Sequence, residues 1–261
     1  SGHVRAYQYD STTTTWNQLG EDIDGEAGGD LSGWSVNLSA DGSIVAIGAI
    51  GAKDSSGFET GHVRVYQYDN STTQWNQLGQ DIDGEASGQP FGDQSGYSVS
   101  LSADGSIVAI GARYNDGNGT DSGHVRVYQY DNSSSQWNQL GEDIDGEEGG
   151  QFSGDESGYS VSLSADGSIV AIGAIGAKDS SGFETGHVRI YQYNSSSTQW
   201  IQLGQDIDGE AEYDDSGHSV SLSADGSIVA IGAPKNDGNS TDSGHVRVYQ
   251  YNSSTSTWNQ L

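Results

Sequence analysis

Residues 97–112 read YSVSLSADGSIVAIGA, and this stretch decides the fold. In its first part Val99 and Leu101 alternate with serines, which predicts a strand with one apolar face. Asp104-Gly105 follows, a dipeptide that two-residue hairpin turns prefer because both turn positions need positive φ. The apolar residues 107–110 then predict the second strand. Together these features indicate a β-hairpin.

This hairpin sequence is repeated along the chain. The segment SADGSIVAIGA begins at Ser39, Ser102, Ser164 and Ser223. A second segment, GHVR, begins at Gly2, Gly61, Gly123, Gly186 and Gly244. A third, WNQL, begins at Trp16, Trp75, Trp137 and Trp258, and Trp200 opens the variant WIQL. The resulting period near 60 residues is longer than that of most solenoids and is typical of a propeller blade with long loops.

Each repeat predicts four strands and no helix. Residues 62–68 place Val63 and Val65 on one face, and residues 74–78 follow across a Ser/Thr/Asn turn, which predicts a second hairpin. Two hairpins make one four-stranded antiparallel sheet. Five hairpins of the GHVR kind and four of the Asp-Gly kind therefore predict an all-β, propeller-like array of four complete blades plus a half-blade.

We expect residues 1–261 to form a single repeat domain. The repeat units lie at about residues 1–59, 60–121, 122–184 and 185–242, with a half unit at residues 243–261. Because the chain has no Met, we expect it to be a processed product or a fragment of a longer protein. It has no Cys, which excludes a disulfide framework and a thiolate zinc site.

Several segments resemble the FG-GAP repeat of the integrin α-subunit propeller. Residues 96–99 are similar to its Phe-Gly-x-Ser-Val opening without the Phe, residues 232–234 match its Gly-Ala-Pro, and residues 244–249 are similar to its Gly-x-Val-x-Val-Tyr strand. The resemblance covers nearly the whole chain and implies a β-propeller that binds a partner at the cell surface. The family's calcium loop lies between its first two strands, where this chain has only Ser-Ala-Asp-Gly-Ser, which is too short to wrap an ion.

The charge of the chain excludes some classes of partner. With 37 acidic and nine basic residues, its formal net charge is −28. Nucleic acid is excluded because phosphate binding requires clustered Lys and Arg. The longest apolar run, residues 44–52, is well short of the roughly 20 residues of a transmembrane helix, so we expect no membrane span.

The acidic residues are concentrated in four stretches, residues 21–30, 81–93, 142–156 and 206–215, which hold 22 of the 37. Each stretch follows the Trp-containing strand and contains the motif Asp-Ile-Asp-Gly-Glu. In a four-stranded meander the second and fourth connections emerge at the same edge of the sheet. The acidic stretches should therefore share an edge with the loops before GHVR, while the Asp-Gly and Ser/Thr turns occupy the opposite edge.

Oxygen-rich loops with Gly are what a hard cation such as Ca²⁺ selects, so Ca²⁺ is the expected cofactor. The EF-hand register fails, because it puts Gly20 and Leu31 where carboxylates are needed. The alternative is that these are solvated turns of a protein adapted to salt water. The candidate metal ligands are Asp22, Asp24, Glu26, Asp81, Asp83, Glu85, Asp143, Asp145, Glu147, Asp206, Asp208 and Glu210.

Two of the loops before GHVR carry further polar residues at the same edge. Their candidate ligand-binding residues are Asp116, Asn118, Asp121, Asp237, Asn239 and Asp242. Possible N-glycosylation sites, which permit secretion and a glycoprotein, are Asn37, Asn70, Asn118, Asn132, Asn194, Asn239 and Asn252.

All nine basic residues occupy fixed places in the repeat. Five are the Arg of GHVR, on strands whose faces neighbouring blades would cover. We therefore expect these arginines to be structural, pairing with carboxylates or stacking on Tyr. The adjacent His residues share this interpretation.

The sequence favours a non-enzymatic, extracellular binding or adhesion module that presents an acidic, Ca²⁺-binding face to an extracellular protein or glycan. Catalysis is disfavoured because an active site normally needs a unique residue, and only Trp34, Tyr213 and His218 depart from the repeat. One alternative is a multivalent carbohydrate-binding lectin. Another is a structural repeat protein that self-associates through unpaired sheet edges into a fibre or array.

Overall fold

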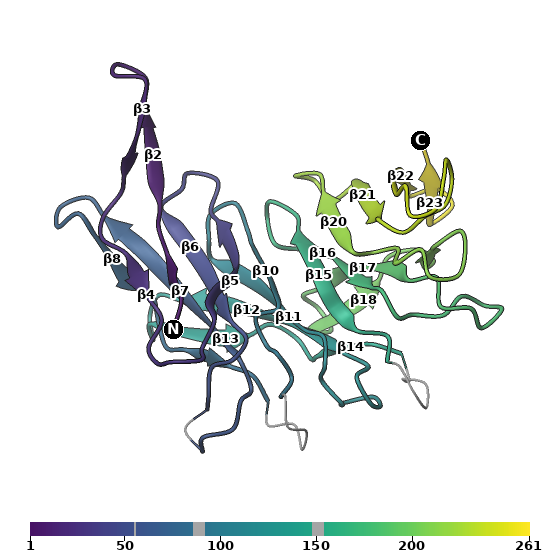
Figure 1. The fold of residues 1–261 in the computed structure, drawn as a ribbon, viewed down its shortest axis with the longest axis horizontal. Helices are drawn as coiled ribbons and strands as arrows, with labels where there is room; N and C mark the ends of the chain where they lie inside the picture. Colours follow the sequence, from purple (N-terminus) through teal and green to yellow (C-terminus); the bar gives the residue numbers. More distant parts are fainter. Residues whose placement is uncertain (55, 86–91, 148–153) are drawn as a thin grey trace.

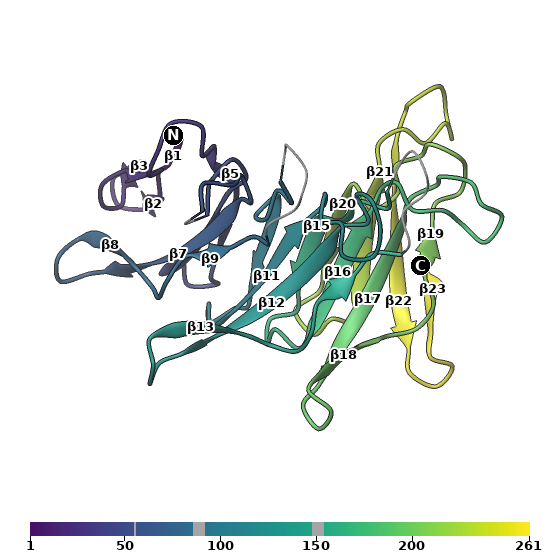
Figure 2. The same ribbon diagram turned by 90° about the horizontal axis from the view of Figure 1, so that it is seen from below.

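The computed structural model describes residues 1–54, 56–85, 92–147 and 154–261, and within them the protein is all-β. Antiparallel sheets follow one another along a row, from an N-terminal hairpin to a C-terminal sheet (Figure 1). Seen from below, the sheets pack face to face (Figure 2). No helix in the described ranges is long and apolar enough to cross a membrane.

Four sheets have the predicted meander of four strands in sequence order. Sheet 1 consists of β5 (Ser32–Leu38), β6 (Ile44–Ala49), β7 (His62–Asp69) and β8 (Gln74–Gln77). Sheet 2 consists of β10 (Ser98–Leu101), β11 (Ile107–Ala112), β12 (His124–Asp131) and β13 (Gln136–Gln139). Sheet 3 consists of β15 (Ser157–Leu163), β16 (Ile169–Ala174), β17 (His187–Asn194) and β18 (Gln199–Gln202). Sheet 4 consists of β20 (Ser219–Leu222), β21 (Ile228–Ala233), β22 (His245–Asn252) and β23 (Thr257–Gln260).

The half-blade is the N-terminal hairpin. It consists of β1 (His3–Val4), β2 (Tyr7–Asp10), β3 (Thr15–Gln18) and β4 (Ile23–Asp24), with β2 paired to β3 and β1 to β4. The sheets thus begin at the Ser-Val strand, whereas the repeat units 1–59 to 185–242 begin near GHVR. Residues 243–261, the expected half unit, form the second hairpin of sheet 4. The prediction of four complete blades plus a half-blade is confirmed.

The sequence predicts that the acidic motif lies in a loop, but part of the motif forms a short strand. Its Ile-Asp pair forms the short strands β4, β9 (Ile82–Asp83), β14 (Ile144–Asp145) and β19 (Ile207–Asp208). In sheet 2, β13 pairs with the second half of β12 and β14 with its first half, so the edge strand is broken in two. The physical reason is that the apolar Ile144 side chain is only 5% exposed, and its burial against the sheet brings the adjacent Asp145 into β14.

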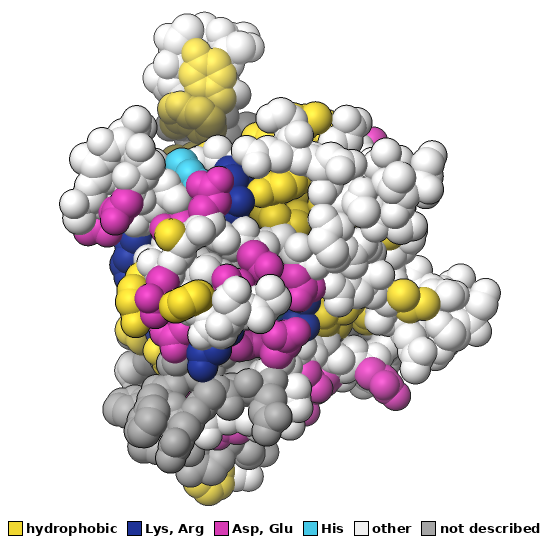
Figure 3. All heavy atoms as spheres, turned by 90° about the vertical axis from the view of Figure 1, so that its right-hand side faces the viewer, with side chains coloured by type: hydrophobic (Ala, Val, Ile, Leu, Met, Phe, Trp, Pro, Cys, Tyr) yellow, Lys and Arg dark blue, Asp and Glu magenta, His cyan; other side chains and the backbone are white. Residues whose placement is uncertain are grey.

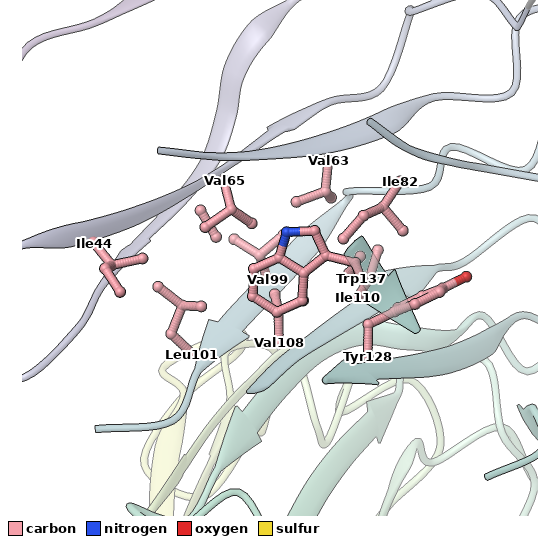
Figure 4. Close-up of a cluster of buried hydrophobic side chains, with 11 residues drawn as sticks. Ile44, Val63, Val65, Ile82, Val99, Leu101, Val108, Ile110, Tyr128 and Trp137 are labelled. Carbon is pink, nitrogen blue, oxygen red and sulfur yellow. The ribbon is translucent and has the colours of Figure 1, made fainter. Parts of the chain in front are cut away.

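The core lies between the sheets. Figure 4 shows Val63 and Val65 of sheet 1 facing Val108 and Ile110 of sheet 2, and in this view the indole of Trp137 lies over the middle of the cluster. Each Trp of a later sheet donates its indole N–H to the carbonyl of the Leu that ends the preceding Trp strand. The donor–acceptor distance is 2.7 Å from Trp137 Nε1 to Leu78 O, and the other three bonds are as short.

Replacing Trp137 with Phe should lower the free energy of unfolding by about 2 kcal/mol, because a 3% exposed side chain loses volume and its hydrogen bond to Leu78. Denaturant unfolding measures this change. The matched control is Trp16→Phe, since Trp16 is 68% exposed and its loss should change stability by less than about 0.5 kcal/mol. Equal effects of the two changes would contradict this account of the core.

Candidate functional site: the acidic edge of the sheets

The acidic motifs and the loops before GHVR lie at one edge of the sheets, as strand order predicts. In sheet 2, Asp145 is the partner of His124 at the start of β12, and Asn118 donates its side-chain amide to Gly146 O at 2.9 Å. We call this edge, made of residues 22–26, 81–85, 143–147 and 206–210 with loops 113–122 and 234–243, the acidic edge. From the C-terminal side, acidic side chains (magenta) surround basic ones (dark blue) (Figure 3).

The opposite edge is closed by the Asp-Gly turns. In the first of them Asp41 Oδ1 accepts hydrogen bonds from Ser43 N at 2.9 Å, Ser39 Oγ at 2.7 Å and Ser43 Oγ at 2.7 Å. These bonds lower the pKa of Asp41 to about 2. The position of the FG-GAP calcium loop is thus occupied by a turn whose carboxylate is already satisfied.

The three acidic residues of one motif do not converge on one point. Asp143 accepts a hydrogen bond from Gln139 at 2.6 Å within its own sheet. Glu147 instead lies 3.7 Å from Arg189 of the next sheet. In the other three motifs the first Asp also pairs within its own repeat and the Glu with an Arg of the next sheet. These pairs of residues are Asp81 and Glu85, Asp206 and Glu210, and Asp22 and Glu26. The predicted ligand set is therefore shared between neighbouring blades.

Stacking creates a different grouping, in which a Glu meets the His and first Asp of the following sheet. The ligand atoms of Glu26, His62 and Asp81 lie within 4.8 Å of one another, and so do those of Glu85, His124 and Asp143. Sequence reasoning missed these clusters because the Glu of each belongs to the preceding repeat, more than 35 residues before the His. The only signal was the constant place of His beside Arg in every repeat.

Three histidines of this edge, His62, His124 and His187, are buried, and burial lowers the pKa of each. His124 is 1% exposed, and burial followed by the charge of Arg126 lowers its pKa to about 4. Neither ring nitrogen of His124 has a hydrogen-bond partner, although Nδ1 lies 3.6 Å from Asp143 Oδ2. A neutral imidazole beside two carboxylates can hold a divalent cation, and its nitrogen suits Zn²⁺ better than Ca²⁺.

Arginines join neighbouring sheets along the acidic edge. Arg126 donates Nη2 to Asp83 O at 2.8 Å, lies 3.8 Å from Glu85, and sits 5.7 Å from the ring centroid of Tyr128. Arg64 and Arg247 make the equivalent bonds to Asp24 O and Asp208 O, at 3.2 and 2.6 Å. The expected structural role of these arginines, pairing and stacking, agrees with this geometry.

The predicted ligand residues of the loops mostly hold those loops together. Asp116 Oδ1 accepts a hydrogen bond from Asp121 N at 2.9 Å, and Asp237 Oδ1 accepts one from Asp242 N at 2.8 Å. Asn118 is bound to Gly146, whereas Asn239 is exposed. Burial, followed by the charge of Asp116, raises the pKa of the half-buried Asp121.

A row of aromatic rings crosses the sheets at the start of each first strand. The ring centroids of Trp34 and Tyr97 are 5.6 Å apart, and those of Tyr97 and Tyr159, and of Tyr159 and His218, are 5.0 Å apart. Arg113 lies over Tyr97 at 4.1 Å. Sequence reasoning noticed Trp34 and His218 only as departures from the repeat, and did not see that they extend one row.

Comparison with known proteins agrees with this geometry. A model of the FG-GAP repeat matches residues 85–128 and 207–249. Two segments of the chain thus match the FG-GAP repeat. No curated protein sequence matches it significantly.

Solved structures that resemble this chain include the periplasmic gluconolactonase of Pseudomonas aeruginosa. Identity is 15% and the TM-score 0.59, over 98% of this chain and 62% of the gluconolactonase, so the chain spans about three fifths of that protein. Two others have TM-scores of 0.49 and identities of 13%. One is hydrazine synthase of Kuenenia stuttgartiensis, and the match covers 89% of this chain and 50% of the hydrazine synthase chain. The other is a candidate 6-phosphogluconolactonase of Bacteroides uniformis, and the match covers 98% of this chain and 76% of the lactonase chain.

The prediction that the chain is not an enzyme is wrong, because the comparison does not allow catalysis to be excluded. It relied on the near-identity of the repeats, yet the fold of this chain is also the fold of a gluconolactonase. Fold alone therefore does not decide between binding and reaction.

Replacing Arg126 with Met should lower the free energy of unfolding by about 2 kcal/mol, because Asp83 O loses its charged donor while the buried stem is kept. The control is Arg5→Met. The Arg5 side chain is 47% exposed, so solvent screens its pair with Asp22 and its loss should lower stability much less than the loss of Arg126. Denaturant unfolding of both variants is the measurement, and a smaller loss for Arg126 than for Arg5 would contradict the assignment.

Replacing Asp121 with Asn should stabilise the protein at pH 7, by about 1–2 °C in Tm. The pKa of Asp121 is raised in the folded state, so its charge disfavours folding above that pKa, and the disadvantage disappears as the pH falls below the unfolded value. Thermal unfolding from pH 7 to 3 should show the gain vanish. Asp242→Asn, at the exposed equivalent position, is the control and should change Tm less.

Proposed function

We propose that this chain is an extracellular binding and adhesion module that holds its partner along the acidic edge. One observation carries the proposal: the second Asp of the motif recurs at the same place on successive sheets, exposed to solvent. The Asp83 and Asp208 side chains are 52% and 41% exposed. Partial burial and then the charge of Asp143 raise the pKa of Asp145, which means that the folded protein disfavours the charged form of this carboxylate.

Repetition makes such an edge suited to multivalent contact. Equivalent carboxylates on neighbouring sheets can each contribute a weak contact to one extended partner, and linked weak contacts give high avidity. The chain has few charges of its own to neutralise them. Eight of its nine basic residues already lie within 4 Å of a carboxylate. A basic protein surface is the partner that fits best.

A divalent cation is part of this proposal. The clusters Glu26–His62–Asp81 and Glu85–His124–Asp143 bring one nitrogen and two carboxylate ligands together. We propose Zn²⁺ there rather than the Ca²⁺ predicted from the motif, because the imidazole nitrogen is a ligand that Ca²⁺ rarely takes.

A lectin is the second candidate, and the aromatic row favours it. Trp34 is 50% exposed at one end of the row and His218 is exposed at the other. Aromatic faces with nearby hydroxyl and carboxylate groups suit a sugar, whose C–H groups pack on rings while its hydroxyls form hydrogen bonds.

The test compares binding of the chain to arrays of basic peptides and of glycans, with added Ca²⁺, with added Zn²⁺ and with chelator. In one variant Asp83, Asp145 and Asp208 are changed to Asn. In the control, Asp10, Asp69 and Asp131 of the opposite edge are changed to Asn, which removes the same charge. The control should fold normally, because Asn194 and Asn252 accept the same turn hydrogen bonds in other repeats.

We expect the acidic-edge variant to lose at least tenfold in affinity for basic peptides and the control to lose less than twofold. Zn²⁺ should change binding or thermal stability and Ca²⁺ should not. Equal losses in the two variants, or no binding to any basic peptide, would overturn the adhesion proposal, and glycan binding alone would favour the lectin.

A further inference from the structure

The residue before each Asp-Ile-Asp-Gly-Glu motif alternates between Glu and Gln along the chain. Glu21 and Glu142 precede the first and third motifs, whereas Gln80 and Gln205 precede the second and fourth. Each lies beside the Trp strand of the following sheet. Glu ends in a carboxylate and Gln in an amide of nearly the same shape. At this position the two residue types give two different interfaces between neighbouring sheets.

Where the residue is Gln, its side chain closes the interface. Gln80 Nε2 donates to Trp137 O at 2.9 Å, and Trp137 N donates to Gln80 Oε1 at 3.0 Å. Gln205 makes the same two bonds to Trp258, at 3.0 and 3.1 Å. The amide thus pairs with the free edge of the Trp strand as another β-strand would. Both of these Trp side chains are 3% exposed.

Where the residue is Glu, the same position is an open pocket. A pocket of about 290 Å³ is lined by Glu142, Asp143, Asp145, Tyr191 and Trp200. Its equivalent, of about 320 Å³, is lined by Glu21, Asp22, Asp24, Tyr66 and Trp75. Trp75 and Trp200 are only partly buried, unlike the Trp residues beside Gln.

The open pocket presents hydrogen-bond acceptors from the Trp strand and from the Glu side chain. Trp200 faces Tyr193 in the register in which Trp137 faces Tyr130, so the N–H and C=O of Trp200 also point away from the sheet. A Glu carboxylate can accept from that N–H but cannot donate to the C=O. Among the described residues no side chain takes the place that Gln80 fills. A ligand that pairs with both the Trp carbonyl and the Glu carboxylate would therefore be a donor.

We propose that the Glu21 and Glu142 pockets bind guanidinium groups, supplied by exposed arginines of a protein partner. The inference rests on the proposed function and names the chemistry of the partner. A guanidinium is planar like the Gln amide, and it carries only donors, so one N–H reaches the Trp carbonyl while others reach the Glu carboxylate. Tyr and Trp rings line the pocket, and guanidinium groups stack on such rings. The chain itself places Arg126 over Tyr128, the residue equivalent to Tyr191.

The experiment titrates the ¹⁵N-labelled full chain with N-acetyl-L-arginine amide and follows the indole and backbone signals of the four Trp residues by NMR. We expect saturable shifts at Trp75 and Trp200 and none at Trp137 and Trp258. The lysine, glutamine and methyl-glucoside analogues are separate arms, and each should bind at least tenfold more weakly.

Two reciprocal variants test the role of the alternating residue. Glu142→Gln should abolish the response of Trp200 and leave that of Trp75, since the new amide closes the pocket. Gln80→Glu should make Trp137 respond. Both variants reproduce a residue that the chain already carries at an equivalent position, so both should fold. Asp131→Asn is the control for a single change of charge and should leave all responses unchanged.

Equal shifts at all four Trp residues, a Trp200 response that survives Glu142→Gln, or equal binding of the lysine analogue would each overturn the guanidinium assignment. These outcomes are separable from failure of the adhesion proposal. If basic peptides still bind through Asp83, Asp145 and Asp208 while Glu142→Gln has no effect, the acidic edge binds its partner by charge alone and the pocket inference is wrong.

Discussion

Close stacking of sheets through small side chains and glycines is the constraint on which the rest of the structure depends. Ala46 and Ala109 are fully buried, and Gly111 lies so close to the next sheet that a Cβ added to it would sit 2.1 Å from Gly158 O. A four-stranded sheet of this size cannot bury both faces alone, so each sheet needs its neighbour. The small side chains of the repeated IVAIGA strand are therefore explained by close packing between sheets.

Stacking also makes the acidic edge. No single repeat contains a complete site, because Glu85 finds Arg126 and His124 only across an interface. The arginines hold the backbone of one sheet to the side chains of the next, and so place successive carboxylates at constant spacing. In the N-terminal hairpin, Arg5 pairs instead with Asp22 of its own repeat.

The strands and the shared edge could be predicted from the sequence because they depend on local patterns. Val99, Leu101 and Asp104-Gly105 specify a hairpin regardless of what packs on it. The turn is longer than the predicted two-residue turn, because Ser102 N donates to Ile107 O and only Gly105 of the pair has a positive φ. The partners of each acid could not be predicted, since they depend on which sheet lies beside which. Ile144 was missed as a strand residue because two residues give no visible alternation. The exclusion of catalysis failed for a related reason, because similarity between repeats describes the sheets and the chemistry of a fold resides in its loops.

Near-identity between copies hides small differences that stacking amplifies. On a fully exposed surface Glu and Gln side chains such as those of Glu142 and Gln80 would be interchangeable, because they are similar in size and flexibility. Beside the free edge of a Trp strand they differ, because that edge offers one donor and one acceptor, and only the amide can hydrogen-bond to both. The alternation of these two residues gives the array two kinds of interface on one backbone. One kind is completed by the chain itself, and the other is left for a group from outside.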